Sequence, residues 1–374
     1  MDASRFIHAR AHAIDASGIR KVFDLAAQLE DPINFSIGQP DFDVPPNVRQ
    51  AAIDAIQSRQ NAYTVTQGIA PLRRRIAEQL DGEFGHPPDG VLVVSGVSGG
   101  LLLTLMACVG AGDEVLFVDP YFVMYKHLTH AMGATPVMVS AYPDFDLPID
   151  ALRQAITPRT KLLLINSPAN PTGRVIPDDQ LRAAAALARE HDLLIVSDEI
   201  YLPLSYDRPS PSIYPHAPER TILLRGFSKG HGMTGWRLGY AAGPAAVLEA
   251  MTRLQQYTFV CAPSMVQYAG LAALDTPVDD RVREYRDKRD LVYGLLKDRF
   301  EVVRPEGGFY VFPKAPAGYA SASEFVARAI ENNVLIIPGN VFSECDTHFR
   351  ISYATGNDRI RRGCEILCGL AQAS

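Results

Sequence analysis

Lys229 lies in a glycine-rich segment, residues 226–237, with the sequence GFSKGHGMTGWR. A strand-like run at 221–225 ends just before this segment. A lysine held among glycines at the end of a strand can lose its proton, and the neutral amine can then attack a carbonyl and form a Schiff base. A lone lysine in a loop is usually a solvated surface residue. The chemical interpretation therefore depends on which other polar side chains the fold brings to the same place.

The elements that must position Lys229 alternate between short β-branched runs and helical patterns from about residue 91 to residue 243. We predict strands at 91–94, 114–118, 136–139, 161–165, 193–196 and 221–225, and helices at 100–108, 121–132, 149–156 and 179–191. This order is typical of an α/β protein whose mainly parallel sheet is covered by helices on both faces.

The chain changes character after residue 245. Helical patterns dominate through residue 299, and the charged stretch 279–290 is interpreted as the solvated face of a long helix. Predicted strands at 308–312, 334–337 and 349–353, with helices at 323–332 and 358–371, indicate a second, smaller α/β unit. The segment that precedes Gln39 could join either unit.

Several predicted loops fall at the carboxyl ends of parallel strands, where open α/β sheets bind ligands. The 95–100 turn opens a helix, so its free N–H groups and the helix dipole favour a phosphate, with the Ser98 hydroxyl as a further donor. Arg237, which we place on the strand after Lys229, could clamp the same phosphate. Each feature alone has an ordinary structural explanation, such as a helix cap or a surface ion pair.

The remaining loops at this edge offer an amide, a carboxylate and a phenol. Asp198 could hold a positive charge on a ring nitrogen, and Tyr201 and Asn170 could form hydrogen bonds to a phenolate oxygen. Asn170 could equally belong to a simple β-turn, and Asp198 could cap a helix. Helix caps, turns and surface ion pairs do not explain why all these polar groups gather at one edge of the sheet. Their common position indicates a ligand site.

Composition excludes several functional classes. The chain has 374 residues, is 47% hydrophobic and carries a net charge of -6 without a long basic run, so nucleic-acid and membrane-surface roles have little support. Five scattered cysteines are typical of reduced thiols and a cytoplasmic protein. Cys364 and Cys368 are one helical turn apart, but no nearby His or Cys completes a metal site, so helix packing is expected. Residues 1–15 resemble neither a signal peptide nor a spanning helix.

An ordered set of motifs carries a family resemblance over nearly the whole chain. The motifs are GQPDF at 38–42, residues 63–68, PLR at 71–73, NPTG at 170–173, DEIY at 198–201, SK at 228–229, GWRLGY at 235–240, GGFY at 307–310 and FRISYA at 349–354. Together they resemble the class I/II aminotransferases of fold type I, the aspartate aminotransferase superfamily, which depend on pyridoxal 5'-phosphate. The resemblance implies a large cofactor-binding domain at 41–274 and a small α/β domain built from 1–40 and 275–374.

The resemblance also implies roles for the residues of the cofactor site. Lys229 would carry pyridoxal phosphate as an aldimine and shuttle the substrate's proton, and Asp198 would pair with the ring nitrogen. The other implied cofactor contacts are Asn170 and Tyr201 at the ring oxygen, Phe122 stacked on the ring, and Val97, Ser98, Ser228 and Arg237 around the phosphate.

The implied substrates are an L-amino acid and a 2-oxo acid. Arg350 would hold the substrate's α-carboxylate as a planar fork, with Gly38 and Asn170 beside it. Tyr63 would reach the phosphate of the other subunit, which implies a homodimer with shared sites. Two positions depart from the family pattern: Gly226 stands where many relatives have a serine or threonine phosphate ligand, and Ser98 stands where some aspartate- or prephenate-specific relatives have a lysine.

Other functions remain open at this stage. Residues 226–230 satisfy the serine hydrolase pattern G-x-S-x-G around Ser228, with Asp275 or Asp279 and His348 in a workable order, although the glycines that follow disfavour the helix of a nucleophile elbow. A nicotinamide dehydrogenase would use the 95–100 turn and Asp119, but the G-x-G-x-x-G spacing is not met. A non-catalytic regulator, or a related C–S lyase, decarboxylase or cyclopropane-forming synthase, would share many of the same residues.

Overall fold

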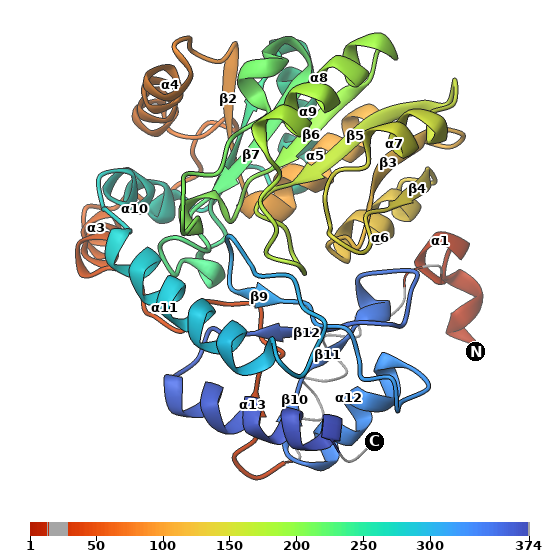
Figure 1. Cartoon of the computed structure of the whole chain (residues 1–374). Coiled ribbons are helices and arrows are strands. Elements are labelled where there is room, and N and C mark those ends of the chain that lie inside the picture. Colours follow the sequence, from red (N-terminus) through yellow and green to blue (C-terminus); the bar gives the residue numbers. More distant parts are fainter. Residues whose placement is uncertain (13, 15–28, 373–374) are drawn as a thin grey trace.

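The computed structural model describes residues 1–12, 14 and 29–372 of the chain. Its central feature is a seven-stranded sheet with the order β2-β8-β7-β6-β5-β3-β4 (Figure 1). The strands are β2 (Gly90–Val94), β3 (Glu114–Asp119), β4 (Thr135–Ser140), β5 (Thr160–Asn166), β6 (Leu194–Asp198), β7 (Thr221–Gly226) and β8 (Gly239–Gly243). Strand β8 runs antiparallel to both of its neighbours, and the pairings among the other strands are parallel. The predicted mainly parallel sheet is therefore confirmed.

Helices cover both faces of this sheet. They are α5 (Gly96–Cys108), α6 (Met124–Ala131), α7 (Ile149–Ala155), α8 (Asp178–Glu190) and α9 (Ala245–Thr258). The residues of β5 alternate between two cores: Leu162 and Leu164 belong to the cluster shared with α5 and α9, and Leu163 and Ile165 belong to the cluster shared with α7 and α8. A strand that is buried on both sides must be apolar at consecutive positions. This explains the continuous apolar run from which the sequence predicts strand β5.

The second part of the molecule is built around short strands. β1 (Ile33–Asn34) pairs with β10 (Val334–Leu335) in parallel, and β11 (Ile337–Pro338), β12 (Phe349–Ser352) and β9 (Tyr310–Val311) form an antiparallel sheet. Helices α11 (Asp279–Leu296), α12 (Ala322–Glu331) and α13 (Asn357–Gln372) pack around them (Figure 1). The segment that leads to Gln39 thus pairs with the C-terminal part of the chain, through β1.

The remaining described helices are α1 (Ala9–His12), α3 (Pro46–Gln57), α4 (Ala70–Phe84) and α10 (Ser264–Leu274), with 3₁₀ helices at Ala3–Phe6, Leu202–Leu204, Tyr214–His216, Pro218–Arg220, Thr234–Trp236 and Gly339–Val341. Residues 13 and 15–28 of the predicted small domain lie outside the described residues. Within the described ranges, none of the helices combines the length and the apolar character that crossing a bilayer requires.

Three local predictions are wrong in detail. The helix predicted at 121–132 begins only at Met124, and the N–H of Tyr121 donates to the carbonyl of Phe342. The strand predicted at 334–337 is broken into β10 and β11. Arg237 precedes strand β8 rather than lying on it, and its backbone is left-handed, with φ of 55°.

The charged stretch 279–290 is also less solvated than predicted. It does form the first part of helix α11, but Arg289 is fully buried and Lys288 is 5% exposed. Arg289 donates to both carboxylate oxygens of Asp207, and Lys288 forms ion pairs with Asp41 and Glu284. A buried cation is tolerated only where it is paired, and two of these carboxylates, Asp207 and Asp41, lie outside α11, where the helical pattern does not show them.

Candidate active site

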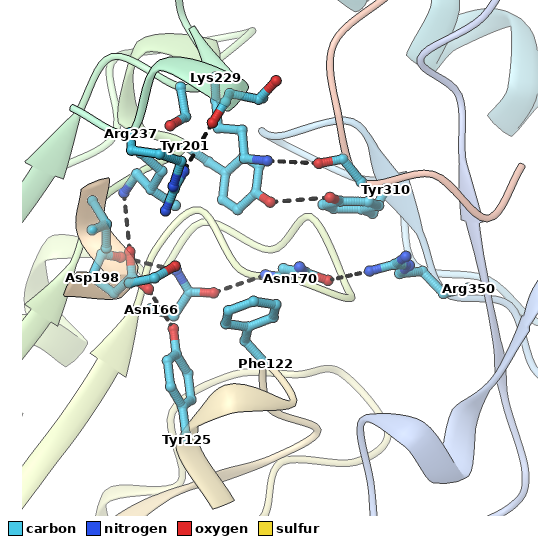
Figure 2. Close-up of a pocket in the computed structure, with 16 residues that line it drawn as sticks. Phe122, Tyr125, Asn166, Asn170, Asp198, Tyr201, Lys229, Arg237, Tyr310 and Arg350 are labelled. Carbon is cyan, nitrogen blue, oxygen red and sulfur yellow. Dashed lines mark hydrogen bonds between the residues drawn. The ribbon is translucent and has the colours of Figure 1, made fainter. Parts of the chain in front are cut away.

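The carboxyl ends of β2, β5, β6 and β7 open onto one cavity of about 250 Å³, which Figure 2 shows in close-up. Among the predicted site residues, Tyr63 alone does not line it; its side chain is exposed. The lining residues are Gly38, Val97, Ser98, Phe122, Tyr125, Asn166, Asn170, Asp198, Ile200, Tyr201, Ser228, Lys229, Thr234, Arg237, Tyr310 and Arg350.

Lys229 follows β7 and extends into this cavity. Its amine donates a hydrogen bond of 2.6 Å to the carbonyl oxygen of Gly38. Burial, reinforced by the charges of Arg350 and Arg237, lowers the pKa of Lys229 to about 8. Near neutral pH a fraction of the amine is therefore already unprotonated, which is the form that attacks a carbonyl.

Asp198 ends strand β6 on the opposite side of the view from Arg350 (Figure 2). Its carboxylate accepts hydrogen bonds from the Tyr125 hydroxyl at 2.7 Å and from the backbone N–H of Ile200 at 3.2 Å. Burial raises the pKa of Asp198 to about 6. A buried carboxylate held by neutral donors is suited to stabilise a cation that a ligand brings, such as a protonated ring nitrogen.

The N-terminus of α5 forms a cradle for an anion. Ser95, at the N-cap, makes no side-chain hydrogen bond to the first turn, so the N–H groups of Val97 and Ser98 remain available to a ligand. Gly96 has φ of +69°, and a Cβ there would lie 2.6 Å from a terminal nitrogen of Arg237. The Arg237 guanidinium is thus held directly against the start of the helix. Helix N–H groups and a guanidinium together match a phosphate.

Arg350 forms the other end of the cavity. It donates to the Asn170 side-chain oxygen at 3.0 Å and to the Ser36 carbonyl at 2.9 Å, and its guanidinium stacks on the Tyr310 and Phe342 rings at 4.4 and 4.5 Å. Its Nε is buried without a hydrogen-bond partner. A buried N–H left in this state requires an acceptor, and a substrate carboxylate has the geometry to supply one.

Tyr201 lies between Lys229 and Tyr310. Its hydroxyl is 3.0 Å from that of Tyr310, and the Lys229 amine is 5.7 Å from the centre of the Tyr201 ring. Burial raises the pKa values of both tyrosines above the ordinary phenol value. Both hydroxyls therefore stay protonated at neutral pH. One O–H is the donor of their mutual hydrogen bond, and the other can donate to a ligand oxygen.

Sequence reasoning missed five residues that line the cavity: Tyr125, Asn166, Ile200, Thr234 and Tyr310. Asn166, Ile200 and Thr234 lie in or beside loops that the sequence singles out, Tyr310 ends the GGFY motif, and Tyr125 lies on helix α6 close to Phe122. Asn166 begins the NPTG loop, where its side chain accepts from the N–H of Asn170 and donates to the carbonyl of Asp198. Their contacts could not be read from the sequence because the partners lie on other elements.

The structure does not bring together the residues that a serine hydrolase or a nicotinamide dehydrogenase would need. Asp275 forms an ion pair with Arg75, His348 stacks on Phe312, and neither lines the cavity that contains Ser228. Burial lowers the pKa of His348 to about 4. Asp119 accepts from the backbone N–H of Glu344 and also lies outside the cavity lining.

Gly226, the first departure from the family pattern, lies at the last position of β7, where it pairs with Gly239 of β8. A Cβ at Gly226 would lie 3.1 Å from the backbone oxygen of Leu238 and 3.2 Å from the Cα of Gly239. A serine or threonine would therefore be crowded by backbone that the β-ladder holds in place. The packing of β7 on β8 accounts for the glycine.

Comparison with known proteins agrees with this geometry. The profile of the family Aminotransferase class I and II matches residues 30–367. The chain is 37% identical to the probable aspartate aminotransferase of Methanocaldococcus jannaschii, over 96% of this chain and 98% of the relative. It is 36% identical to aromatic-amino-acid aminotransferase 2 of Thermococcus litoralis, over 95% and 96% respectively.

The same fold is found among solved structures. The structure of the aspartate aminotransferase from Thermus thermophilus with maleate superposes with a TM-score of 0.93, at 34% identity, over 97% of this chain and 99% of that one. Family profile, relatives and structure agree over nearly the whole length of each chain. The protein therefore belongs to the class I and II aminotransferases, a family of enzymes that transfer amino groups.

Proposed function

We propose that this protein transfers the amino group of an L-amino acid to a 2-oxo acid, with pyridoxal 5'-phosphate bound at Lys229. The observation that carries the proposal is the cavity itself, because it places a half-buried lysine, a buried carboxylate and a helix N-terminus with an arginine around one space of about 250 Å³. Relatives named aspartate and aromatic-amino-acid aminotransferases support the substrate classes.

The lining residues fit the proposed cofactor. Val97, Ser98 and Arg237 would bind the phosphate, with Ser228 beside them, and Phe122 would pack against the ring. Asp198 would face the ring nitrogen, and Asn170 and Tyr201 would donate to the ring oxygen. When bound, the protonated ring supplies an electron sink that acidifies the α-hydrogen of an attached amino acid.

The chain's own groups would then perform the remaining steps. Arg350 and Asn170 would orient the substrate's α-carboxylate, which satisfies the unpaired Nε of Arg350. The Lys229 amine, in the unprotonated fraction that its lowered pKa provides near neutral pH, would take the α-proton of the substrate and later give it back. The hydrogen bond from Lys229 to the Gly38 carbonyl would hold the amine at one place in the cavity.

We further propose that the enzyme is a cytoplasmic homodimer with shared sites. Tyr63 and Tyr257 are 85% and 86% exposed, and Val65, Phe259 and Val260 add apolar surface nearby. The two segments are adjacent, because the Gln255 side chain donates to the carbonyl of Thr66. A contiguous apolar patch of this kind is typical of a subunit interface. A second copy seated there would carry the partner subunit's Tyr63 toward this cavity.

Replacement of Lys229 tests the proposal most directly. We expect Lys229→Ala to bind pyridoxal phosphate without covalent attachment and to give no turnover with amino acids and 2-oxoglutarate or pyruvate. Borohydride treatment followed by peptide mass spectrometry should fix the cofactor to Lys229 in the wild-type chain and not in the variant. Lys314→Ala, at a lysine outside the cavity, is the matched control. Normal turnover by Lys229→Ala would refute the proposal.

A further inference from the structure

We propose that Asp41, Tyr285 and Lys288 form an anchor that holds residues 36–41 across the active-site cavity, which makes Asp41 and Tyr285 positioning residues for the reaction. The inference rests on the proposed function, because the groups being positioned are the amine and guanidinium that it employs. It draws on the buried charges of α11 that the sequence pattern had presented as solvated.

The segment that would be held begins in the small sheets and passes over the cavity. Phe35 is fixed on both sides, since its N–H donates to the carbonyl of Leu335 and its carbonyl accepts from the N–H of Ser352. The next carbonyl, of Ser36, accepts from Arg350 at 2.9 Å, and the carbonyl of Gly38 accepts from the Lys229 amine at 2.6 Å. The backbone of this segment thus supplies acceptors to two of the cationic groups of the site, Lys229 and Arg350.

The far end of the segment is fixed by Asp41. Its carboxylate accepts from the Tyr285 hydroxyl at 2.5 Å and from the Lys288 amine at 2.6 Å. The Tyr285 oxygen in turn accepts from the backbone N–H of Asp41 at 3.1 Å. One residue is therefore held through its backbone and both carboxylate oxygens by two side chains of a single helix.

The two α11 side chains that hold the exposed Asp41 are themselves buried. Tyr285 is fully buried and Lys288 is 5% exposed, and the Lys288 amine lies 4.9 Å from the centre of the Tyr285 ring. The buried Lys288 ammonium is held in place by two carboxylates, those of Asp41 and Glu284. Tyr285 also packs on Phe309, whose ring centre is 5.7 Å from the Lys229 amine. The anchor therefore abuts the wall of the cavity.

The backbone at Gly38 has little room to move toward the wall of the cavity. A Cβ on Gly38 would lie 2.9 Å from the Tyr310 hydroxyl, so the backbone already lies as close to the cavity wall as a glycine allows. A displacement of about 1 Å in a positioned group can reduce catalysis by a factor on the order of 10². Release of Asp41 would move the Gly38 and Ser36 carbonyls away from Lys229 and Arg350 without removing any group that touches the substrate.

Helix α11 offers a matched control. Arg289, the neighbour of Lys288, is also buried and pairs with Asp207, which does not line the cavity. Asp41→Ala and Asp207→Ala each remove one carboxylate from a buried cation of the same helix. Loss of stability alone would affect both variants, whereas loss of positioning would affect only Asp41→Ala.

The test compares steady-state kinetics and hydrogen exchange in these variants. We expect Asp41→Ala and Tyr285→Phe to raise KM for the amino acid by about 10-fold or more and also to lower kcat, and Asp207→Ala to keep the wild-type KM and kcat. In the cofactor-free chain, exchange measured by mass spectrometry over 33–42 should accelerate in the Asp41 and Tyr285 variants and not in Asp207→Ala. Asp41→Asn, which keeps an acceptor, should recover part of the KM.

The outcomes separate the two proposals. If Asp41→Ala and Tyr285→Phe match Asp207→Ala in KM and in exchange over 33–42, the positioning inference is overturned. If Asp41→Ala does not fold, Tyr285→Phe decides, because it keeps the buried ring and removes only the hydroxyl. If the wild-type chain shows no transamination, the proposed function fails and the catalytic part of this inference with it, while the exchange data still decide whether the anchor exists.

Discussion

At the scale of single residues, Lys229 and Asp198 share one property: burial disfavours the charged form of each. It lowers the pKa of the amine to about 8 and raises that of the carboxyl to about 6. In the free chain both groups therefore have a cost in stability that a ligand bearing an aldehyde and a cation would relieve. An amine and a carboxyl group whose pKa values are both shifted within one cavity are typical of active sites.

The lowered pKa of Lys229 predicts how the free chain reacts with aldehydes. Only the neutral amine condenses with a carbonyl, so the rate of condensation between the cofactor-free chain and pyridoxal should rise with pH through a midpoint near 8. An ordinary lysine would give a midpoint near 10.4. Stopped-flow absorbance across pH 6–11 measures the midpoint, with Lys229→Ala as the control that lacks this phase. A midpoint at the ordinary value would show that the amine is not desolvated in solution.

The raised pKa of Asp198 predicts opposite effects on stability and activity. Because the folded-state pKa lies above the unfolded value, the cost of Asp198 is absent near pH 4, grows as the pH rises toward 6 and is complete above 6. Asp198→Asn should therefore stabilise the cofactor-free chain by about 1–3 kcal/mol at pH 7 and by little at pH 4. Its kcat should fall by a factor on the order of 10² because the ring nitrogen loses its counter-charge.

Denaturant unfolding of the cofactor-free variant at the two pH values, with steady-state kinetics at pH 7, checks the Asp198 prediction. Asp119→Asn serves as the control, since Asp119 is also mostly buried but does not line the cavity. Equal kcat for Asp198→Asn and the wild type would exclude the carboxylate from the electronic role assigned to it.

At the scale of elements, the start of α5 is the part of the site that depends most on backbone conformation. Gly96 combines a left-handed φ with close contact to Arg237, so Gly96→Ala would be strained and would displace the guanidinium. We expect this variant to lose affinity for pyridoxal phosphate by at least about 10-fold, while its affinity for pyridoxal, which lacks the phosphate, stays unchanged. Equilibrium titration by absorbance measures both, and Gly369→Ala, in open space on α13, is the control.

At the scale of the whole molecule, the proposed shared sites predict complementation between two inactive variants. A mixed dimer of Lys229→Ala and Tyr63→Ala has one cavity that lacks both residues and one that retains Lys229 together with the partner subunit's Tyr63. Random reassortment of equal amounts should therefore restore about a quarter of wild-type activity. Activity after mixing, unfolding and refolding of the two variants measures this, and light scattering measures the mass. If light scattering confirms a dimer but the mixed variants recover no activity, Tyr63 does not contribute to the site of the partner subunit.

The predicted division into 41–274 and the pair 1–40 with 275–374 remains a prediction. It draws the boundary at Asp41, which α11 holds from the other side of that boundary. Strands β1 and β10 already join the two ends of the chain in one sheet. Separate expression of residues 41–274 would test the division, and it would also remove the partners that fix Asp41.

Much of the site was predictable because several of its residues lie next to strands that short sequence patterns reveal. Lys229, Asp198 and Asn170 each follow a strand whose apolar run is visible in the sequence, and parallel strands bring their carboxyl ends to one edge whatever the details of packing. Arg350 could not be placed by that rule, because β12 belongs to another sheet. Only its resemblance to a family motif pointed to the cavity.

The amino-acid sequence by itself determined the alternating elements, the parallel sheet and the residues at its edge, since strand periodicity and turn chemistry act over a few neighbouring positions. The tertiary structure alone decided that the Lys229 amine bonds to the Gly38 carbonyl, that the Tyr201 and Tyr310 hydroxyls meet, and that α11 buries cations. The partners of Lys229, Tyr201, Lys288 and Arg289 in these contacts are between 82 and 247 positions away in the chain, and the energy of each contact depends on burial and charge that only packed elements create.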